Sequence, residues 1–263
     1  MMPTAELSAN SPLLESKFRQ ILGIRFFTGS AEEVADLMEA GGLLVVPAAP
    51  ALKDLPTNLS YRDALLNADV AIPDSAFMVL LWRIRTGERI VRVSGLEYLR
   101  VFFQRPSVRL PGNTFWVMAS EQSAARNLAY LKTQGIEVEP RDCYIAPFYK
   151  AEVTDPELVR RIQAGRYAHV VITVGGGKQE QLGLYLKRNL QPLPGIHCIG
   201  AAIAFLSGDQ VHIPGWADRF WLGWLFRCIS NPASYVPRYW SARKLAALLF
   251  RYRDRLPVAG GGS

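Results

Sequence analysis

The stretch Asp69-Val-Ala-Ile-Pro-Asp-Ser75, followed by Ala76-Phe-Met-Val-Leu-Leu-Trp-Arg-Ile-Arg85, is the unit from which the fold can be predicted. Residues 69–72 are short, apolar and partly β-branched, as in a buried strand, and Pro73 closes them. The run that follows has the length and composition of a helix. We therefore expect a strand that leads directly into a helix. In an open α/β sheet, ligands bind at the carboxyl ends of such strands, which is where Asp74 lies.

An aspartate at this position has two interpretations. It can cap the following helix by accepting a hydrogen bond from a backbone N–H group, which aspartate does commonly. It can also face a ligand and act on it as a base. The stretch by itself favours capping.

The same alternation of strands and helices continues along the chain. Helices are predicted at 31–40, with Ser30 as the cap, and at 61–67, 121–134, 155–164 and 178–189. Strands are predicted at 43–46, 114–119, 138–145, 169–174 and 196–202. Repeated alternation of this kind predicts an α/β fold, with a mostly parallel sheet and helices on both faces.

Composition narrows the class of protein. The chain has 263 residues, of which 49% are hydrophobic, enough for one large domain or one domain with an appendage. Its three cysteines are scattered, which argues against a disulfide framework and a zinc site and favours a reducing cytoplasm. Residues 1–11 do not resemble a signal peptide. The longest apolar run, 196–207, is shorter than the ~18 residues that a membrane span needs.

The net charge of +7 is concentrated near the carboxyl end. Residues 209–263 contain eight Lys or Arg against three acids, and four of the six tryptophans. We therefore divide the chain into a core at 1–208 and a basic appendage at 209–263. A basic, Trp-rich segment is typical of helices that lie in an anionic lipid interface. The alternative is a pair of amphipathic helices that pack on the core. Nucleic acid is not expected, because no reading module accompanies the charge.

A second candidate site follows the strand predicted at 169–174. Gly175, Gly176 and Gly177 connect it to a helix, so that backbone N–H groups and the charge of Lys178 can meet a phosphate. The alternative is a tight turn that needs glycine for its positive φ. No D-x-D pair or spaced histidine set predicts a metal site, and we expect His169 to be a packed core residue.

Five ordered blocks carry a resemblance to a known family. They are Asn67-Ala-Asp-Val-Ala-Ile-Pro-Asp74, Arg92-Val-Ser-Gly95, Gly175-Gly-Gly-Lys-Gln-Glu180, Gly200 to Gly208, and Trp224-Leu-Phe-Arg227 with Pro232. In order and spacing the chain resembles the WecG/TagA/CpsF glycosyltransferases. The resemblance implies a Rossmann-like core and a basic appendage that helps to close the site. It also implies an inverting transfer, without metal or cofactor, from a UDP-sugar to a polyprenyl-diphosphate-linked sugar. The product would belong to exopolysaccharide or cell-envelope polysaccharide, made at the cytoplasmic face of the membrane by a peripheral protein.

The resemblance also implies roles for individual residues. Asp74 corresponds to the general base, and Arg92 and Gln179 to residues that line the pocket. Arg227 matches an arginine near the diphosphate, and Arg238 is the nearest substitute for a further basic residue. The glycines at 175–177 and Lys178 belong to the same substrate or UDP site.

Departures from the family pattern keep two alternatives open. The Thr-Pro-Asn element expected after the first strand is replaced by Pro47-Ala-Ala-Pro50, which removes polar groups near the substrates. One alternative is a catalytically silent subunit that binds a nucleotide sugar or an assembly partner. The other is a basic module for membranes or nucleic acid, with the α/β core as its scaffold. The retention of Asp74 and Gln179 favours the enzyme.

Overall fold

The computed structural model describes residues 12–150, 152–200, 202–208, 225, 228–229 and 232–260, without the side chains of 234, 235, 238 and 239. Its centre is an eight-stranded sheet in the order β1-β2-β4-β3-β8-β7-β5-β6. Among the strand pairs of the described residues, only β1–β2 is antiparallel, so the predicted mostly parallel sheet is confirmed. The strands are β1 (Phe18–Ile21), β2 (Ile24–Phe27), β3 (Gly42–Val45), β4 (Val70–Ala71), β5 (Thr114–Met118), β6 (Cys143–Ile145), β7 (His169–Ile172) and β8 (Gly195–Cys198).

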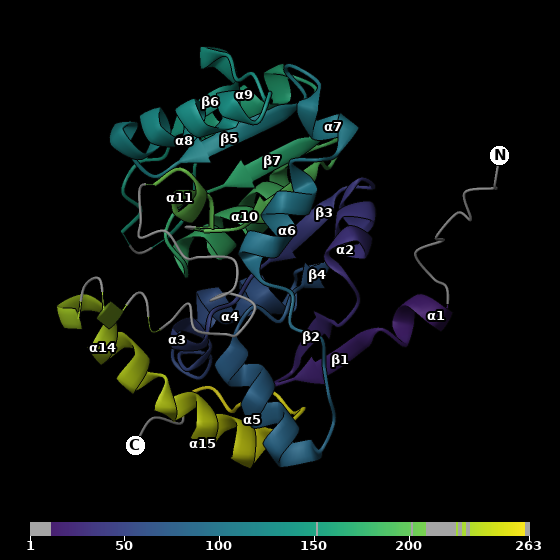
Figure 1. The fold of residues 1–263 in the computed structure, drawn as a ribbon, viewed down its shortest axis with the longest axis vertical. Coiled ribbons are helices and arrows are strands. Elements are labelled where there is room, and N and C mark those ends of the chain that lie inside the picture. Colours follow the sequence, from purple (N-terminus) through teal and green to yellow (C-terminus); the bar gives the residue numbers. More distant parts are fainter. Residues whose placement is uncertain are drawn as a thin grey trace.

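Helices cover both faces of this sheet (Figure 1). Those that pack on one face are α3 (Ala49–Leu52), α4 (Leu59–Leu66), α5 (Ala76–Thr86), α9 (Pro156–Ala164), α10 (Lys178–Asn189) and α15 (Arg243–Tyr252). Those that pack on the other are α1 (Pro12–Glu15), α2 (Ala31–Met38), α6 (Gly95–Phe102), α7 (Pro106–Arg109), α8 (Glu121–Thr133) and α11 (Ala202–Leu206). Helix α14 (Pro232–Ser241) precedes α15. The α/β class with helices on both faces is therefore confirmed.

The chain continues on opposite faces of the sheet after the neighbouring strands β3 and β8. After β3 the chain continues into α3 and α4, and after β8 into α11 on the other face. A crevice forms at the carboxyl edge of a sheet where neighbouring connections diverge in this way, and ligands of α/β proteins bind there. The topology therefore places the candidate site above the ends of β4, β3, β8 and β7.

Local signals explain why the predicted elements form. Ser30 caps α2 through a capping box with Glu33, and α10 spans the predicted residues 178–189. Two predicted strands are shorter in the structure. The strand at 138–145 is reduced to β6 because Pro140, which has no N–H to donate, opens a 3₁₀ turn. The strand at 196–202 ends at Cys198, since Gly200 takes a φ of +57° and the chain turns into α11.

An antiparallel hairpin at the sheet edge was not predicted. Strands β1 and β2 are joined by Leu22 and Gly23, both with positive φ, a tight turn that the pattern of residues does not signal. Their backbone N–H groups donate to the carbonyl oxygens of Arg253 and Asp254, at 2.7 Å each. The end of the chain therefore closes the turn that begins the sheet.

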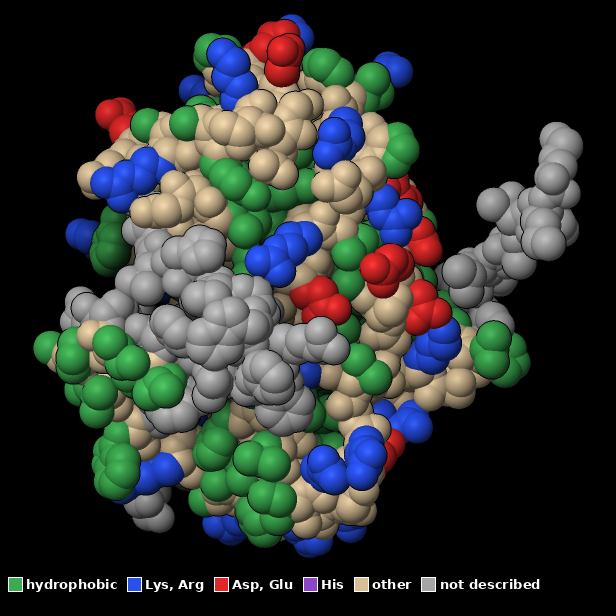
Figure 2. All heavy atoms as spheres, in the orientation of Figure 1, with side chains coloured by type: hydrophobic (Ala, Val, Ile, Leu, Met, Phe, Trp, Pro, Cys, Tyr) green, Lys and Arg blue, Asp and Glu red, His purple; other side chains and the backbone are tan. Residues whose placement is uncertain are grey.

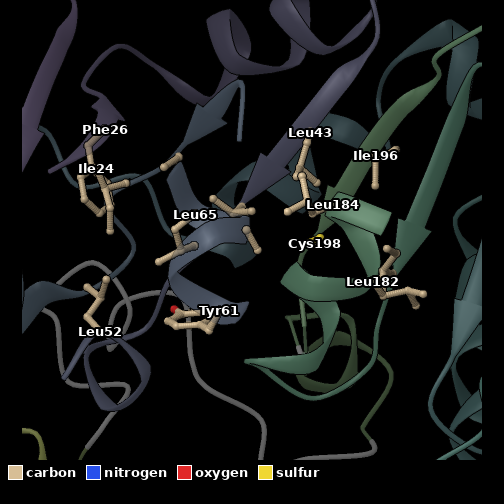
Figure 3. Close-up of a cluster of buried hydrophobic side chains, with 14 of the residues drawn as sticks. Ile24, Phe26, Leu43, Leu52, Tyr61, Leu65, Leu182, Leu184, Ile196 and Cys198 are labelled. Atoms are coloured by element: carbon tan, nitrogen blue, oxygen red, sulfur yellow. The ribbon is translucent and has the colours of Figure 1, made fainter. Parts of the chain in front are cut away.

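The larger core cluster fills the space between the sheet and α4, α10 and α15. Figure 3 shows the part of this cluster that α4 and α10 contribute, with Leu65 and Leu182 among the labelled side chains. Gly183 of α10 allows close packing, because a Cβ atom there would lie 2.6 Å from the Cys198 sulfur and 2.7 Å from Leu43 Cδ1. Leu245 and Leu249 of α15 are fully buried in the same cluster. The apolar face of α15 thus packs on the core, as the amphipathic alternative predicted, while residues 209–224 lie outside the described part of the chain.

A chain of buried polar side chains crosses the core at the opposite edge from the site. The Tyr98 hydroxyl lies 2.8 Å from Nδ1 of His197, and Nε2 of His197 lies 3.2 Å from Nδ1 of His169. Nε2 of His169 lies 3.1 Å from the Ser107 hydroxyl. Burial lowers the pKa of both histidines, so they are held neutral. The expectation that His169 is a core residue is confirmed.

Candidate active site

Asp74 lies just beyond β4, where the buried residues Ile72 and Pro73 carry the chain to the carboxyl edge of the sheet. The expectation that it caps α5 is wrong: Ser75 is the N-cap, and its hydroxyl accepts from the N–H of Met78 at 3.1 Å. A hydroxyl placed one residue later satisfies the same helix end and leaves the carboxylate available. Oδ1 of Asp74 instead accepts from the N–H of Gly95, the first residue of α6, at 3.1 Å.

Arg92 holds Asp74 from the other side. Its Nε donates to the Asp74 carbonyl oxygen at 2.7 Å, and its Nη2 lies 3.8 Å from Asp74 Oδ1. The Asp74 side chain remains 29% exposed, and no described residue donates a hydrogen bond to its Oδ2. The carboxylate is therefore fixed through one oxygen and the backbone, while the other oxygen can receive a proton.

Gln179 and Glu180 begin α10 at the end of β7. The Nε2 of Gln179 donates to Glu180 Oε1 at 3.1 Å, and Glu180 Oε2 accepts from the N–H of Gly177 at 2.6 Å. Both side chains are buried, and burial raises the pKa of Glu180. Oε1 of Gln179 is buried without a hydrogen-bond partner among the described residues, although buried polar atoms are usually satisfied. This oxygen therefore has unused capacity to accept a hydrogen bond.

Across the carboxyl edge of the sheet, Gln179 faces the turn after β8. A Cβ atom at Gly200 would lie 3.2 Å from Gln179 Nε2, so glycine lets the backbone approach this side chain closely. The Cys198 thiol also donates to the Gln179 carbonyl oxygen at 3.2 Å. Gln179 is therefore held between β7 and β8, in the crevice that the topology predicts.

The three glycines before α10 differ in whether backbone conformation or packing requires a glycine at that position. Gly177 has a φ of +92°, which accounts for glycine there as a turn residue. Gly175 and Gly176 do not have a φ in the left-handed region, and a Cβ atom on either would meet nothing within 4 Å. Neither backbone strain nor packing demands glycine at these two positions. The turn alternative therefore explains Gly177, and the phosphate-site interpretation stays a prediction for Gly175 and Gly176.

Two adjoining hollows lie over this glycine turn, of about 250 and 260 Å³. They share Asn58, Gly176 and Gly177 as lining residues. The first is also lined by Pro50, Ala51, Lys53, Asp54, Tyr61 and Ser241, and the second by Ser60, Lys150, Lys178 and Gln181. Each is close to the ~300 Å³ lower bound of small-molecule sites, so the two together have room for a phosphate-bearing group.

Tyr61 is the most informative residue of these hollows (Figure 3). Its ring packs in the core and its hydroxyl is buried without a partner among the described residues. Burial and the nearby Glu180 and Asp54 raise the pKa of this hydroxyl, so it stays protonated and can donate a hydrogen bond to a ligand. Lys53, in the same hollow, is paired with Asp54 at 2.6 Å. Tyr61, Lys53 and Asn58 were not predicted as site residues, because no motif marks them and the packing of α3 and α4 near α10 brings them to the turn.

The predicted site residues thus fall into three groups. Asp74 and Arg92 are in contact at the end of β4, and neither lines the two hollows. Gly176, Gly177 and Lys178 line the hollows beyond β7. Gln179 lies beside Gly200, between the ends of β7 and β8. With β3 and β8 between β4 and β7, three strand spacings give about 14 Å between the first and second groups. Arg227 lies outside the described residues, and Arg238 belongs to α14 with its side chain not described.

Within the described part of the chain, no three His, Cys, Asp or Glu side chains gather as metal ligands. No described helix is long and apolar enough to cross a membrane.

Comparison with known proteins gives two matches. The model of the glycosyl transferase WecG/TagA/CpsF family matches residues 19–258. A protein of Bacillus spizizenii (strain ATCC 23059 / NRRL B-14472 / W23) is 23% identical over 217 residues, which cover 80% of this chain and 82% of the relative. That relative is named N-acetylglucosaminyldiphosphoundecaprenol N-acetyl-beta-D-mannosaminyltransferase.

Proposed function

The chain belongs to the WecG/TagA/CpsF family of glycosyltransferases, and from this premise we propose that it moves a sugar from a UDP-sugar to the sugar of a polyprenyl diphosphate. The name of the Bacillus relative supports the acceptor, since that protein acts on an N-acetylglucosaminyl group linked through diphosphate to undecaprenol. The proposed product is a lipid-linked intermediate of a cell-envelope polysaccharide or exopolysaccharide.

The observation that carries the proposal is the environment of Asp74. Its Oδ1 is engaged by the Gly95 N–H and the Arg92 guanidinium, while Oδ2 accepts no hydrogen bond from the described residues. In the proposed reaction, Oδ2 takes the proton of an acceptor hydroxyl as that oxygen forms a bond to the anomeric carbon. The bond from the anomeric carbon to the β-phosphate oxygen breaks, and UDP leaves with its electron pair. Attack opposite the leaving group inverts the anomeric configuration.

The donor would lie across the carboxyl ends of β8 and β3. An extended sugar nucleotide has the length to join the glycine turn before α10 to the carboxylate beyond β4. We assign its diphosphate to the N–H groups of Gly175 and Gly176 and to Lys178, and a sugar or ribose hydroxyl of the donor to the unpaired Oε1 of Gln179. The N–H of Gly177 is already bonded to Glu180. Arg227 and Arg238 are proposed to complete this site from the basic segment.

Charge develops on UDP as the anomeric bond breaks. We propose that positive groups meet this charge without a metal ion: the fixed Arg92 and the helix N-terminus at α10, joined by Arg227 and Arg238. Preorganised donors of this kind stabilise a transition state because they do not need to reorient.

The proposed location is the cytoplasmic face of the membrane, with the protein held peripherally. The lipid-linked acceptor requires that the site reach a membrane surface. The basic residues of 209–263 are proposed to contribute attraction to anionic lipid.

The test is turnover by the wild type and by Asp74→Asn, which keeps the shape and removes the base. A panel of UDP-sugars is combined with short-chain polyprenyl-diphosphate sugars, and both UDP release and glycolipid are measured. We expect a decrease of about 10²–10⁴ in kcat for Asp74→Asn, the usual contribution of a general base. Asp36→Asn, a carboxylate on α2 paired with Arg105, is the matched control and should keep its rate. Equal rates for the two variants would remove Asp74 from the mechanism.

The same assay tests the finer claims. The anomeric configuration of the product, measured by NMR, should be opposite to that of the donor. Activity should survive EDTA, and its loss with recovery on added Mg²⁺ would contradict the metal-independent proposal.

A further inference from the structure

Helix α5 is apolar on two sides. Its inner face buries Met78, Val79, Leu81 and Trp82 in the core. Its outer face exposes Phe77, Leu80 and Ile84, at 39%, 44% and 63%. These three residues are spaced three and four apart, so they form one stripe along the helix. Single exposed apolar residues are ordinary, whereas an aligned row marks an interaction surface.

Positive charge frames this stripe. Arg83 lies in the last turn of α5 and Arg89 just beyond it, both exposed, and Arg85 is half-buried between them. None of the three forms an ion pair with another described residue. Helix α15, which packs against α5, adds the exposed Arg243, Lys244 and Arg251. An apolar stripe beside Arg and Lys is typical of helices that lie in an anionic lipid interface.

Helix α14, which contacts α15, also exposes apolar side chains beside positive charge. Its exposed Val236 and Trp240 add apolar area, and Arg243 lies 4.6 Å from the centre of the Trp240 ring. Figure 2 shows hydrophobic side chains gathered over α5 and over α14 on one face of the molecule, with Lys and Arg side chains around its lower rim. The surface is therefore wider than one helix.

The stripe is also close to the candidate base. Ser75 caps α5, so Phe77 at one end of the stripe is only three residues from Asp74. One turn of an α-helix rises about 5.4 Å. A surface in contact with the start of α5 would therefore lie at a distance of this order from Asp74. A sugar linked to a polyprenyl lipid through diphosphate lies just above the bilayer. A membrane at α5 would thus present the acceptor hydroxyl at the height of Asp74.

We propose that the stripe of Phe77, Leu80 and Ile84 rests in the interface of an anionic bilayer and that α5 orients the carboxyl edge of the sheet toward it. This inference deepens the proposed function and rests on it for the link to the acceptor. It assigns the membrane contact to a helix of the core, joined by α14 and α15, rather than to the basic segment alone.

The experiment measures binding of the full chain to phosphatidylglycerol/phosphatidylcholine vesicles by sedimentation. The test variant is Phe77→Ser/Leu80→Ser/Ile84→Ser. The matched control is Leu13→Ser/Leu66→Ser/Leu110→Ser, which removes three exposed leucines elsewhere. We expect the vesicle partition coefficient to fall at least about tenfold for the test variant and to stay within about twofold for the control, since interfacial binding scales with buried apolar area. Vesicles of phosphatidylcholine alone should bind the wild type weakly.

A second measurement separates this inference from the proposed function. With a water-soluble, short-chain acceptor the test variant should keep wild-type turnover, and with the acceptor embedded in vesicles it should lose it. Vesicle binding that depends on the stripe, with no turnover of any acceptor by the wild type, would overturn the proposed function and keep the membrane surface. Unchanged vesicle binding would overturn the membrane surface. A change from dimer to monomer in analytical ultracentrifugation, with vesicle binding unchanged, would show instead that a second copy covers the stripe.

Discussion

Replacing Gly176 by alanine separates the two explanations of the glycine turn. A Cβ atom at this position meets nothing within 4 Å, and Gly176 does not have a φ in the left-handed region. We therefore expect the free energy of unfolding to change by no more than about 0.5 kcal/mol, as for other unconstrained surface positions.

Binding of the donor should change much more. Gly176 lines both hollows that we assign to the diphosphate, and an added methyl group would hold a phosphate away from the backbone N–H groups of the turn. A hydrogen bond to a charged group contributes about 1.5–3 kcal/mol. Its loss predicts a Kd for UDP about 10- to 150-fold higher. Isothermal titration calorimetry with UDP measures this directly, and chemical denaturation supplies the stability.

Gly177→Ala is the matched variant in the same turn. Because Gly177 has a φ of +92°, alanine there would be strained, at about 1–3 kcal/mol of stability. The two variants thus predict opposite patterns, with binding lost in one and stability lost in the other. If Gly176→Ala binds UDP as the wild type does, the turn is structural and the diphosphate lies elsewhere.

Two further predictions concern the core. Leu249→Ala on α15 should cost about 2–5 kcal/mol of unfolding free energy, because the side chain is fully buried in the main cluster. Phe250→Ala next to it, 47% exposed, should cost no more than about 0.5 kcal/mol, and equal effects in urea denaturation would mean that α15 does not belong to the core. Burial lowers the pKa of His197 and His169 in the folded protein. Below the ordinary histidine pKa of about 6.5, the unfolded chain therefore binds more protons than the folded protein does. The stability that these residues contribute is lost as the pH falls below this value. His197→Leu should therefore show a smaller fall in unfolding free energy from pH 7.5 to 5.5 than the wild type, and identical slopes would refute this assignment.

Much of the fold was predictable because local signals agree with the tertiary structure. Helix α10 spans the residues predicted from its pattern, and Ser30 caps α2 as expected. The hairpin of β1 and β2 was not predictable, since its turn is completed by the carbonyl oxygens of Arg253 and Asp254, more than 200 residues away along the chain. Local propensity contains no information about such a partner.

Like the fold, the candidate site was only partly predictable from the sequence. The position of Asp74 at a strand end follows from the sequence, but its role as a cap was wrong, because Ser75 takes that role and Gly95 and Arg92 hold the carboxylate. The buried Gln179 oxygen and the buried Tyr61 hydroxyl, both without partners among the described residues, had no signal in the sequence. Whether a polar atom is satisfied depends on every neighbour around it, and those neighbours come from separate elements.

The sequence by itself determined the alternation of strands and helices, the family blocks and the residue types at the carboxyl edge, because periodicity and turn chemistry are local properties. Only the tertiary structure decided that α15 packs on the core, that α3 and α4 enclose the glycine turn, and that α5 leaves an apolar stripe exposed beside Asp74. In each case, the packing of the folded chain determines which side chains are buried and which stay exposed. An apolar helix face has the same sequence pattern whether it meets a core, another chain or a membrane, and the packing of distant elements determines which faces remain open.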